Sequence, residues 1–347
     1  MKLNVRSDLA IATSARICLT IGYLSMGLLL AAHLAFAQPL QGVYRGAAPG
    51  GPPNTDAYSN WLGKNITLGQ DFLPSDTWAN ITGPNWLLSP WQSWVQAQPG
   101  RNLLLAVPML PSGSGYSLQA CASGAYDSYW ATLATNLVNH GLGSAYLRLG
   151  WEFDGRWYAW KAPQGSGLEA SYAGCFRSIV NAMRNSQPGA AWQFVWNTAT
   201  SFSSPTYLAN TWPGSSYVDF IGVDLYDQSW AAGSYPYPAT CDSSCQQQCQ
   251  SNAWNSNVRY LNMIRDFAQN QQKPMSIPEW GATLRSDGHG GGDDPYYIQN
   301  MHDFMGNPVN NVAFHSYFDF DARDGAHRLS STTTAFPNSA ALFQQLY

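Results

Sequence analysis

The feature that most constrains the fold is an alternation of short apolar runs with segments of helical spacing. Eight runs are predicted to be strands, at residues 41–44, 66–68, 102–109, 146–149, 192–196, 218–223, 275–277 and 312–317. The run at 102–109 is continuously apolar, as in sheets covered on both faces, whereas 168–184 carries its apolar residues on one helical stripe. Strand then helix, repeated eight times without an internal linker, predicts an α/β fold with a single (β/α)8 TIM barrel; an α/β sheet of another strand order is the alternative.

Two of the runs end in the same way, in a glutamate followed by aromatic residues. The strand at 146–149 leads into Glu152 and then Trp157 and Trp160, and the strand at 275–277 leads into Glu279 and Trp280. Barrel active sites lie at the carboxyl ends of the strands. Sugars have polar rims and weakly apolar faces, so their sites combine aromatic rings with a few charged groups. We therefore predict a carbohydrate site with Glu152 and Glu279 as its catalytic pair.

Further residues are expected around this site because they lie at or near strand ends. The predicted substrate-binding residues are Arg148, Trp151, Trp157, Trp160, Tyr226, Trp280, Asp71 and Asn197, with Trp196 and Trp230 as further subsite candidates. In the alternative interpretation, the two glutamates are structural acids paired with arginines, and part of the aromatic set packs in the core.

The motifs and their order resemble clan A of the retaining (β/α)8 glycoside hydrolases, and within it glycoside hydrolase family 26, the β-mannanase group. Three short motifs carry the resemblance over most of the chain. They are Arg148, Glu152, Gly155 and Trp157-Tyr-Ala-Trp160; Gly222-Val-Asp224-Leu-Tyr226; and Glu279-Trp280-Gly281.

The resemblance implies Glu152 as general acid/base and Glu279 as nucleophile, with Arg148 and Tyr226 orienting Glu279. The implied activity is endo-hydrolysis of a β-linked polysaccharide by double displacement, with mannan as the first candidate and no cofactor or metal. One departure concerns the substrate: the family usually has His directly before the acid/base, where this chain has Trp151. Xylan, mixed β-glucan and a bacterial exopolysaccharide therefore stay open, as do a transglycosylase and a non-catalytic polysaccharide-binding barrel.

Composition excludes several other classes of protein. The net charge is −4 and only 11% of residues are charged, whereas 14% are aromatic, including 15 Trp. This balance favours a neutral polysaccharide or oligosaccharide partner over nucleic acid. Neither a G-x-S-x-G elbow nor an H-E-x-x-H pair is present in the sequence, which disfavours esterases and metalloproteases. A monomer is expected.

Residues 1–37 have the pattern of a secretory signal. Lys2, Arg6 and Arg16 precede an apolar segment that ends in Ala35-Phe36-Ala37, a small-x-small cleavage pattern. We therefore expect a secreted, extracellular or periplasmic protein whose catalytic domain is 38–347, without stable membrane association after cleavage. An uncleaved membrane anchor is the alternative.

Five cysteines follow the predicted signal, an odd number. Export favours their oxidation, and at least one must then be free or paired outside the chain. Cys121 with Cys175 is a plausible long-range disulfide. Cys241, Cys245 and Cys249 lie in a Ser/Gln-rich segment predicted to be a loop, where a local disulfide is favoured over a zinc site because no histidine is near. The sequence leaves the pairing open.

Overall fold

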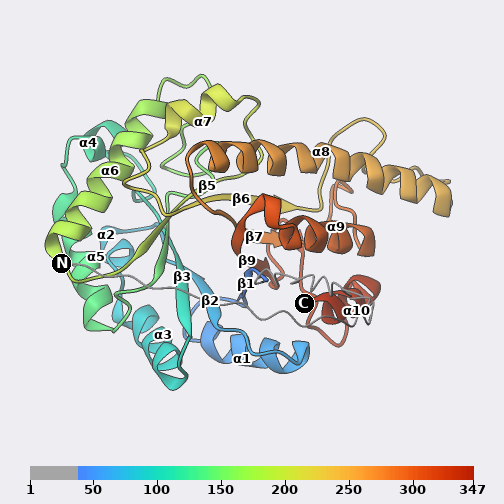
Figure 1. Cartoon of the computed structure of the whole chain (residues 1–347), viewed down its shortest axis with the longest axis horizontal. Helices are drawn as coiled ribbons and strands as arrows, with labels where there is room; N and C mark the ends of the chain where they lie inside the picture. The colour runs from blue at the N-terminus through green and yellow to red at the C-terminus, as the bar shows by residue number, and fades with distance from the viewer. Residues whose placement is uncertain (1–37) are drawn as a thin grey trace, which may run out of the picture. The chain divides into compact units, whose positions relative to one another are not determined.

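Eight parallel strands close into a barrel in the order β1-β2-β3-β4-β5-β6-β7-β9 (Figure 1). The computed structural model describes residues 38–347, so the predicted signal at 1–37 lies outside the described residues. The barrel strands are β1 (Leu40–Tyr44), β2 (Leu68–Phe72), β3 (Asn102–Val107), β4 (Tyr146–Leu149), β5 (Gln193–Thr198), β6 (Phe220–Tyr226), β7 (Met275–Gly281) and β9 (Val312–Phe318). The predicted TIM barrel is confirmed.

Helices separate the strands along the chain and surround them (Figure 1). They are α1 (Gly51–Leu62), α2 (Trp78–Ile81), α3 (Asn85–Ala97), α4 (Leu118–Ala122), α5 (Asp127–Asn139), α6 (Glu169–Ser186), α7 (Pro205–Thr211), α8 (Ser243–Asn270), α9 (Pro295–Gly306), the 3-10 turn η1 (Pro308–Asn310) and α10 (Pro337–Leu346). No helix within residues 38–347 is long and apolar enough to cross a membrane.

Side-chain alternation along the strands explains how polar groups reach the barrel interior. Tyr146 of β4 packs against a small buried cluster that includes Leu104 and Phe314. Because alternate residues of a strand point to the same face, Arg148 points inward as Tyr146 does, further along β4. In β6, the same alternation puts Phe220, Asp224 and Tyr226 on one face of the strand. Phe220 also packs on that cluster.

An irregularity between β6 and β7 sets the position of Glu279. Ser276 pairs with Gly222, but the register then shifts, so that Glu279 lies opposite Asp224. A glycine is required at 222, because a Cβ there would lie 2.9 Å from the Pro278 ring and 3.0 Å from the Ser276 hydroxyl. The shift therefore brings Glu279 to the same level of the barrel as Asp224.

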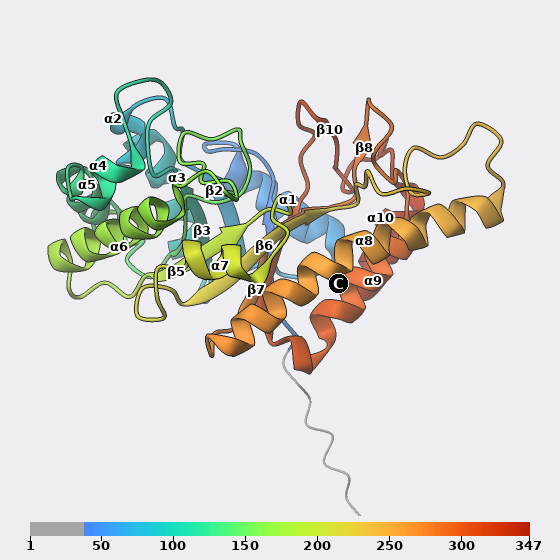
Figure 2. The ribbon, with the colours of Figure 1, turned by 90° about the horizontal axis from the view of Figure 1, so that it is seen from above.

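Two short strands beyond the barrel join distant parts of the chain. β8 (Leu284–Arg285) follows β7, and β10 (Gly325–Ala326) follows β9; they pair antiparallel and lie side by side in Figure 2. Because β8 and β10 come from the segments that follow β7 and β9, their pairing ties these two segments together.

Several predicted boundaries are corrected by the structure. β2 begins two residues later than expected, so Asp71 lies within the strand and not past it. α8 begins at Ser243, where a loop was predicted, because the Asp242 carboxylate caps it by accepting from the Cys245 N–H at 2.9 Å.

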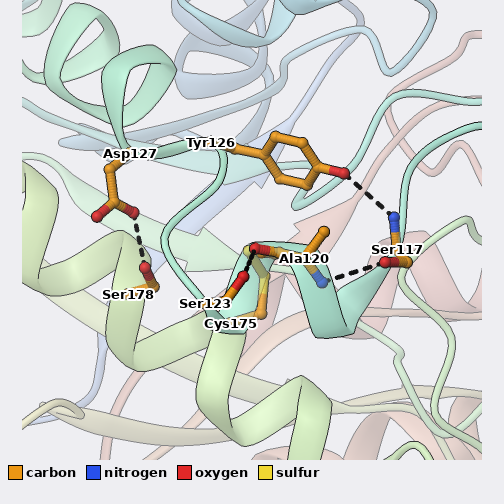
Figure 3. The surroundings of a disulfide bond; sticks show 8 residues. Ser117, Ala120, Ser123, Tyr126, Asp127, Cys175 and Ser178 are labelled. Atoms are coloured by element: carbon orange, nitrogen blue, oxygen red, sulfur yellow. Dashed lines mark hydrogen bonds between the residues drawn. A yellow bond between two sulfur atoms is a disulfide. The ribbon is translucent and has the colours of Figure 1, made fainter.

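The plausible long-range disulfide and a local disulfide are both found, and the structure supplies the pairing that the sequence left open. Cys121 of α4 is bonded to Cys175 of α6, and Figure 3 shows this bridge beside the hydrogen bond from the Ser178 hydroxyl to Asp127, 2.6 Å long. Cys241 is bonded to Cys245 at the start of α8, and Cys249 is buried and unpaired within the described residues.

Candidate active site

A pocket of about 840 Å³ lies at the carboxyl ends of the barrel strands. It is lined by both predicted catalytic residues, Glu152 and Glu279, and by Tyr226. The whole chain contains three glutamates, and the third, Glu169, lies at the start of α6. The structure thus brings together two glutamates from different strand ends in one concave site, as carbohydrate chemistry requires.

Arg148 lies beneath the pocket and connects its acidic groups. Its side chain is fully buried, and each part of the guanidinium has a partner. Nη1 donates to Glu279 Oε2 at 2.9 Å, Nε donates to Asn197 Oδ1 at 2.6 Å, and Nη2 donates to the Asp224 carboxylate. A buried charge is tolerated when it is paired and hydrogen-bonded in this way. Arg148 therefore positions the acids from below.

Glu279 is held by two donors. The Tyr226 hydroxyl donates to Oε1 at 2.7 Å, and Arg148 donates to Oε2. Burial, with the nearby charge of Glu279, raises the pKa of Tyr226 well above its usual value, so that this phenol keeps its proton. With both carboxylate oxygens bonded from the protein, Glu279 has a fixed orientation in the pocket.

Glu152 lies in a different environment. It follows the end of β4 in a tight turn, where its φ is +52°, a backbone conformation that side-chain-bearing residues rarely adopt. Its N–H donates to the Asn197 carbonyl oxygen at 3.0 Å, and Trp157 Nε1 donates to its Oε2 at 2.9 Å. Burial, followed by the charge of Glu279, raises the pKa of Glu152 to about 8. At neutral pH this carboxyl group is therefore mostly protonated, as a general acid must be.

The acidic groups of the pocket are close together. Carboxylate oxygens of Glu152, Asp224 and Glu279 lie within 4.8 Å of one another. Three carboxylates at this spacing have the ligand type of a metal site, but Arg148 already bonds two of them. A cation is thus supplied by the protein itself, and these residues fit a glycosidase pair better than a metal centre.

Two exposed tryptophans line the pocket, Trp157 and Trp230, with 57% and 59% of their surface accessible. Trp157 was predicted to bind substrate, and Trp230 was a further candidate. Trp230 stacks on His289, with ring centroids 5.1 Å apart, and the Arg285 guanidinium lies 5.3 Å from its ring. Both indoles can therefore offer apolar surface to a sugar.

Several predicted substrate-binding residues prove to be structural, which corrects the prediction. Trp160 is buried, and its Nε1 donates to the Trp151 carbonyl oxygen at 2.8 Å. Trp280 is fully buried and packs against Phe343 of α10. Asp71 is fully buried and accepts from Trp91 Nε1 at 2.6 Å. The side chains of these residues are occupied inside the protein and do not line the pocket.

The remaining predicted residues act from behind the pocket. Asn197 is fully buried and links Arg148 to the backbone, since its Nδ2 donates to the Thr198 carbonyl oxygen at 2.8 Å. Trp151 is 5% exposed and covers Arg148, whose guanidinium carbon lies 5.7 Å from its ring. Trp196, a further candidate, is fully buried. Arg148, Asn197 and Trp151 therefore position other groups and do not themselves face the pocket.

Other pocket residues were not found from the sequence. Tyr260, Arg285, Asp324 and His327 line the pocket, but they lie in α8 and in the segments that follow β7 and β9. No motif surrounds them. The pairing of β8 with β10 and the ion pair between Arg285 and Asp324, 3.7 Å long, show that two of these segments meet.

Comparison with known proteins finds similarity to glycoside hydrolases. The model of glycosyl hydrolase family 26 matches residues 125–243, a segment that contains Glu152 and Tyr226. The chain is 29% identical over 124 residues to Endoglucanase H of Acetivibrio thermocellus, covering 34% of this chain. It is 27% identical over 155 residues to a mannan endo-1,4-beta-mannosidase of Bifidobacterium adolescentis, covering 43% of this chain. The matches span 14% of the length of each of these curated relatives.

Solved structures show the same fold. The structure of a Cellulomonas fimi endo-beta-1,4-mannanase double mutant superposes with a TM-score of 0.62 at 17% identity, over 89% of this chain and 70% of that one. The resemblance to family 26 that the motifs predicted is thus confirmed by the family match, and the barrel by the structural match.

Proposed function

We propose that this protein is a secreted glycoside hydrolase that cleaves a β-linked polysaccharide internally and with retention of configuration. The observation that carries the proposal is the pair Glu152 and Glu279, which face one pocket in different environments with oxygens within 4.8 Å. The family match over residues 125–243 supports the same reaction class.

In the first step, the Glu279 carboxylate attacks the anomeric carbon while Glu152 donates its proton to the departing glycosidic oxygen. A bond forms between Glu279 and the sugar, and the glycosidic bond breaks. Retaining enzymes hold their carboxyl groups about 5–5.5 Å apart and inverting enzymes about 6.5–9.5 Å; one oxygen of Glu152 lies within 4.8 Å of one oxygen of Glu279, which is compatible with the shorter range. The raised pKa of Glu152, about 8, suits the proton donor.

In the second step, Glu152, now a carboxylate, removes a proton from a water molecule that attacks the anomeric carbon. The bond to Glu279 breaks, and Glu152 regains its proton. Arg148 and Tyr226 donate to Glu279 and hold it in line with the sugar throughout. Attack by another sugar hydroxyl instead of water would make the same site a transglycosylase.

The substrate class proposed first is β-mannan. The support is the names of the relatives, a mannan endo-1,4-beta-mannosidase and a Cellulomonas fimi endo-beta-1,4-mannanase. β-Glucan is the alternative substrate, because another relative is named Endoglucanase H. The exposed Trp157 and Trp230 suit a chain of several sugars, because each can stack on one sugar face.

Secretion is proposed from the pattern of residues 1–37. Mass analysis of the protein recovered outside the producing cell tests this. A chain that begins at Gln38 is expected, and a chain that retains its first residues would indicate an anchor.

The test of the proposed function is a panel of β-mannan, galactomannan, xylan and mixed-linkage glucan, with released oligosaccharides profiled. We expect one polymer to be cleaved by the wild-type protein and by Glu169→Gln, but not by Glu279→Ala. Glu169→Gln is the matched control because Glu169 lies on α6 outside the pocket. Binding of these polymers without cleavage would contradict the hydrolase and indicate a carbohydrate-binding barrel.

A further inference from the structure

Trp151 and Tyr158 form a hydrogen-bonded pair beside the catalytic residues. Trp151 Nε1 donates to the Tyr158 hydroxyl oxygen at 3.0 Å. The resemblance to family 26 leads us to expect His at position 151. This chain has Trp there, and the indole of Trp151 makes the bond to Tyr158. Tyr158 lines the same pocket as Glu152 and Glu279.

The Tyr158 ring is fixed by its aromatic neighbours. It stacks on Trp160 with centroids 4.4 Å apart and an interplanar angle of 10°, and it meets Trp151 edge-on at 4.9 Å. Trp160 is itself held by the hydrogen bond of its Nε1 to the Trp151 backbone. The hydroxyl group is thus placed by a rigid aromatic set before any sugar binds.

The direction of the Tyr158 proton follows from the donor on Trp151. An indole N–H only donates, so the phenol oxygen must accept this bond, and its own proton must point elsewhere. Within residues 38–347, no side chain or backbone oxygen accepts from the Tyr158 hydroxyl. The phenol also keeps this proton, because burial and the charges of Glu152 and Glu279 raise its pKa well above the usual value.

We propose that the Tyr158 hydroxyl donates a hydrogen bond to an oxygen of the sugar bound beside Glu152 and Glu279, and that Trp151 orients this donor. Tyr158 would then be a specificity-determining residue, since a donor that loses water when the sugar binds favours a sugar with an oxygen at that position over one without it. The inference rests on the proposed function and deepens it: the substrate must be a sugar that presents an acceptor oxygen to Tyr158.

The first test is Tyr158→Phe, which removes the hydroxyl and keeps the stacked ring. Its matched control is Tyr296→Phe, because Tyr296 is 41% exposed on α9, outside the pocket, and its hydroxyl makes no hydrogen bond within the described residues. With mannohexaose, cellohexaose and xylohexaose as probes, we expect Tyr158→Phe to lower kcat/KM by about 5- to 100-fold. Tyr296→Phe should match the wild type.

The second test separates orientation from packing. Trp151→Phe keeps an aromatic ring over Arg148 but removes the N–H that Tyr158 accepts. It should lower kcat/KM in the wild-type background and add no further loss to Tyr158→Phe, because it acts through that hydroxyl. If Trp151 only packed against its neighbours, Trp151→Phe would lower kcat/KM by the same factor in the wild-type protein and in Tyr158→Phe.

The outcomes distinguish this inference from the proposed function. If the wild type cleaves a hexaose and the kcat/KM of Tyr158→Phe is within twofold of the wild-type value, the inference is overturned and the proposed function is not. Binding of a hexaose without cleavage would overturn the proposed hydrolase. The inference would then predict about 5- to 100-fold weaker binding by Tyr158→Phe than by the wild type. Equal affinity of the two proteins would overturn the inference as well. Failure to bind or cleave any hexaose would overturn both.

Discussion

The pKa of Glu152 should depend strongly on Glu279, and Glu279→Gln measures that dependence. The two carboxylates have oxygens within 4.8 Å, and the charge of Glu279 is the second cause, after burial, of the raised pKa of Glu152. Two unit charges at this distance interact by about 3 kcal/mol at an effective dielectric constant of about 20. Since 1.36 kcal/mol corresponds to one pKa unit, Glu279→Gln should lower the pKa of Glu152 from about 8 by about 2.

The composition of the chain makes this measurement simple. It has three glutamates, so protein labelled with ¹³C at the glutamate carboxyl carbon gives three signals, and Glu279→Gln leaves those of Glu152 and Glu169. Glu152→Gln assigns the signal of Glu152, and Glu169 on α6 is the internal reference. A Glu152 pKa that stays the same in Glu279→Gln, or an ordinary value in the wild type, would refute the coupling.

Three further predictions concern the same site. Tyr226→Phe removes a hydrogen bond to the Glu279 carboxylate and should lower kcat by about 10- to 100-fold with little change in melting temperature, as steady-state kinetics and calorimetry can check. Arg148→Met leaves Asp224 and Glu279 without their buried partner and should cost about 3–5 kcal/mol of stability in urea unfolding, whereas an unchanged midpoint would contradict the role of the pair. Because the folded-state pKa of Glu152 is raised to about 8, ionisation of this residue opposes folding as pH rises from about 4.5 to 8; Glu152→Gln should therefore gain melting temperature over the wild type across that range, and a constant difference would argue against it.

The parts of the fold that the sequence predicts are those with a strong local pattern. The eight strands were found because each is an apolar run bounded by turn residues, and the start of β4 at Tyr146 agrees to the residue. Glu152 and Glu279 were found because they follow such runs directly. The start of α8 was missed, because the residues after Asp242 are mostly Ser and Gln and show no apolar stripe.

The sequence did not predict which way the side chains at the site point. Trp157 and Trp160 lie three residues apart in one turn, yet the first is 57% exposed and the second 1%. Asp71 was placed just past a strand end, but the true register of β2 puts it inside the strand, with its carboxylate bonded to Trp91. A shift of one or two residues in a strand decides which groups meet a side chain, and local composition does not fix that shift.

The central claim, that Glu279 is the nucleophile of a retaining hydrolase, is tested most directly by trapping the sugar on the protein. A 2-deoxy-2-fluoro glycoside with a good leaving group, built on the oligosaccharide that the protein cleaves, should react with it once per chain. Peptide mapping by mass spectrometry should then find the sugar on Glu279 and on no other residue. A label on Glu152, or turnover without a trapped sugar and with inverted product, would contradict the account.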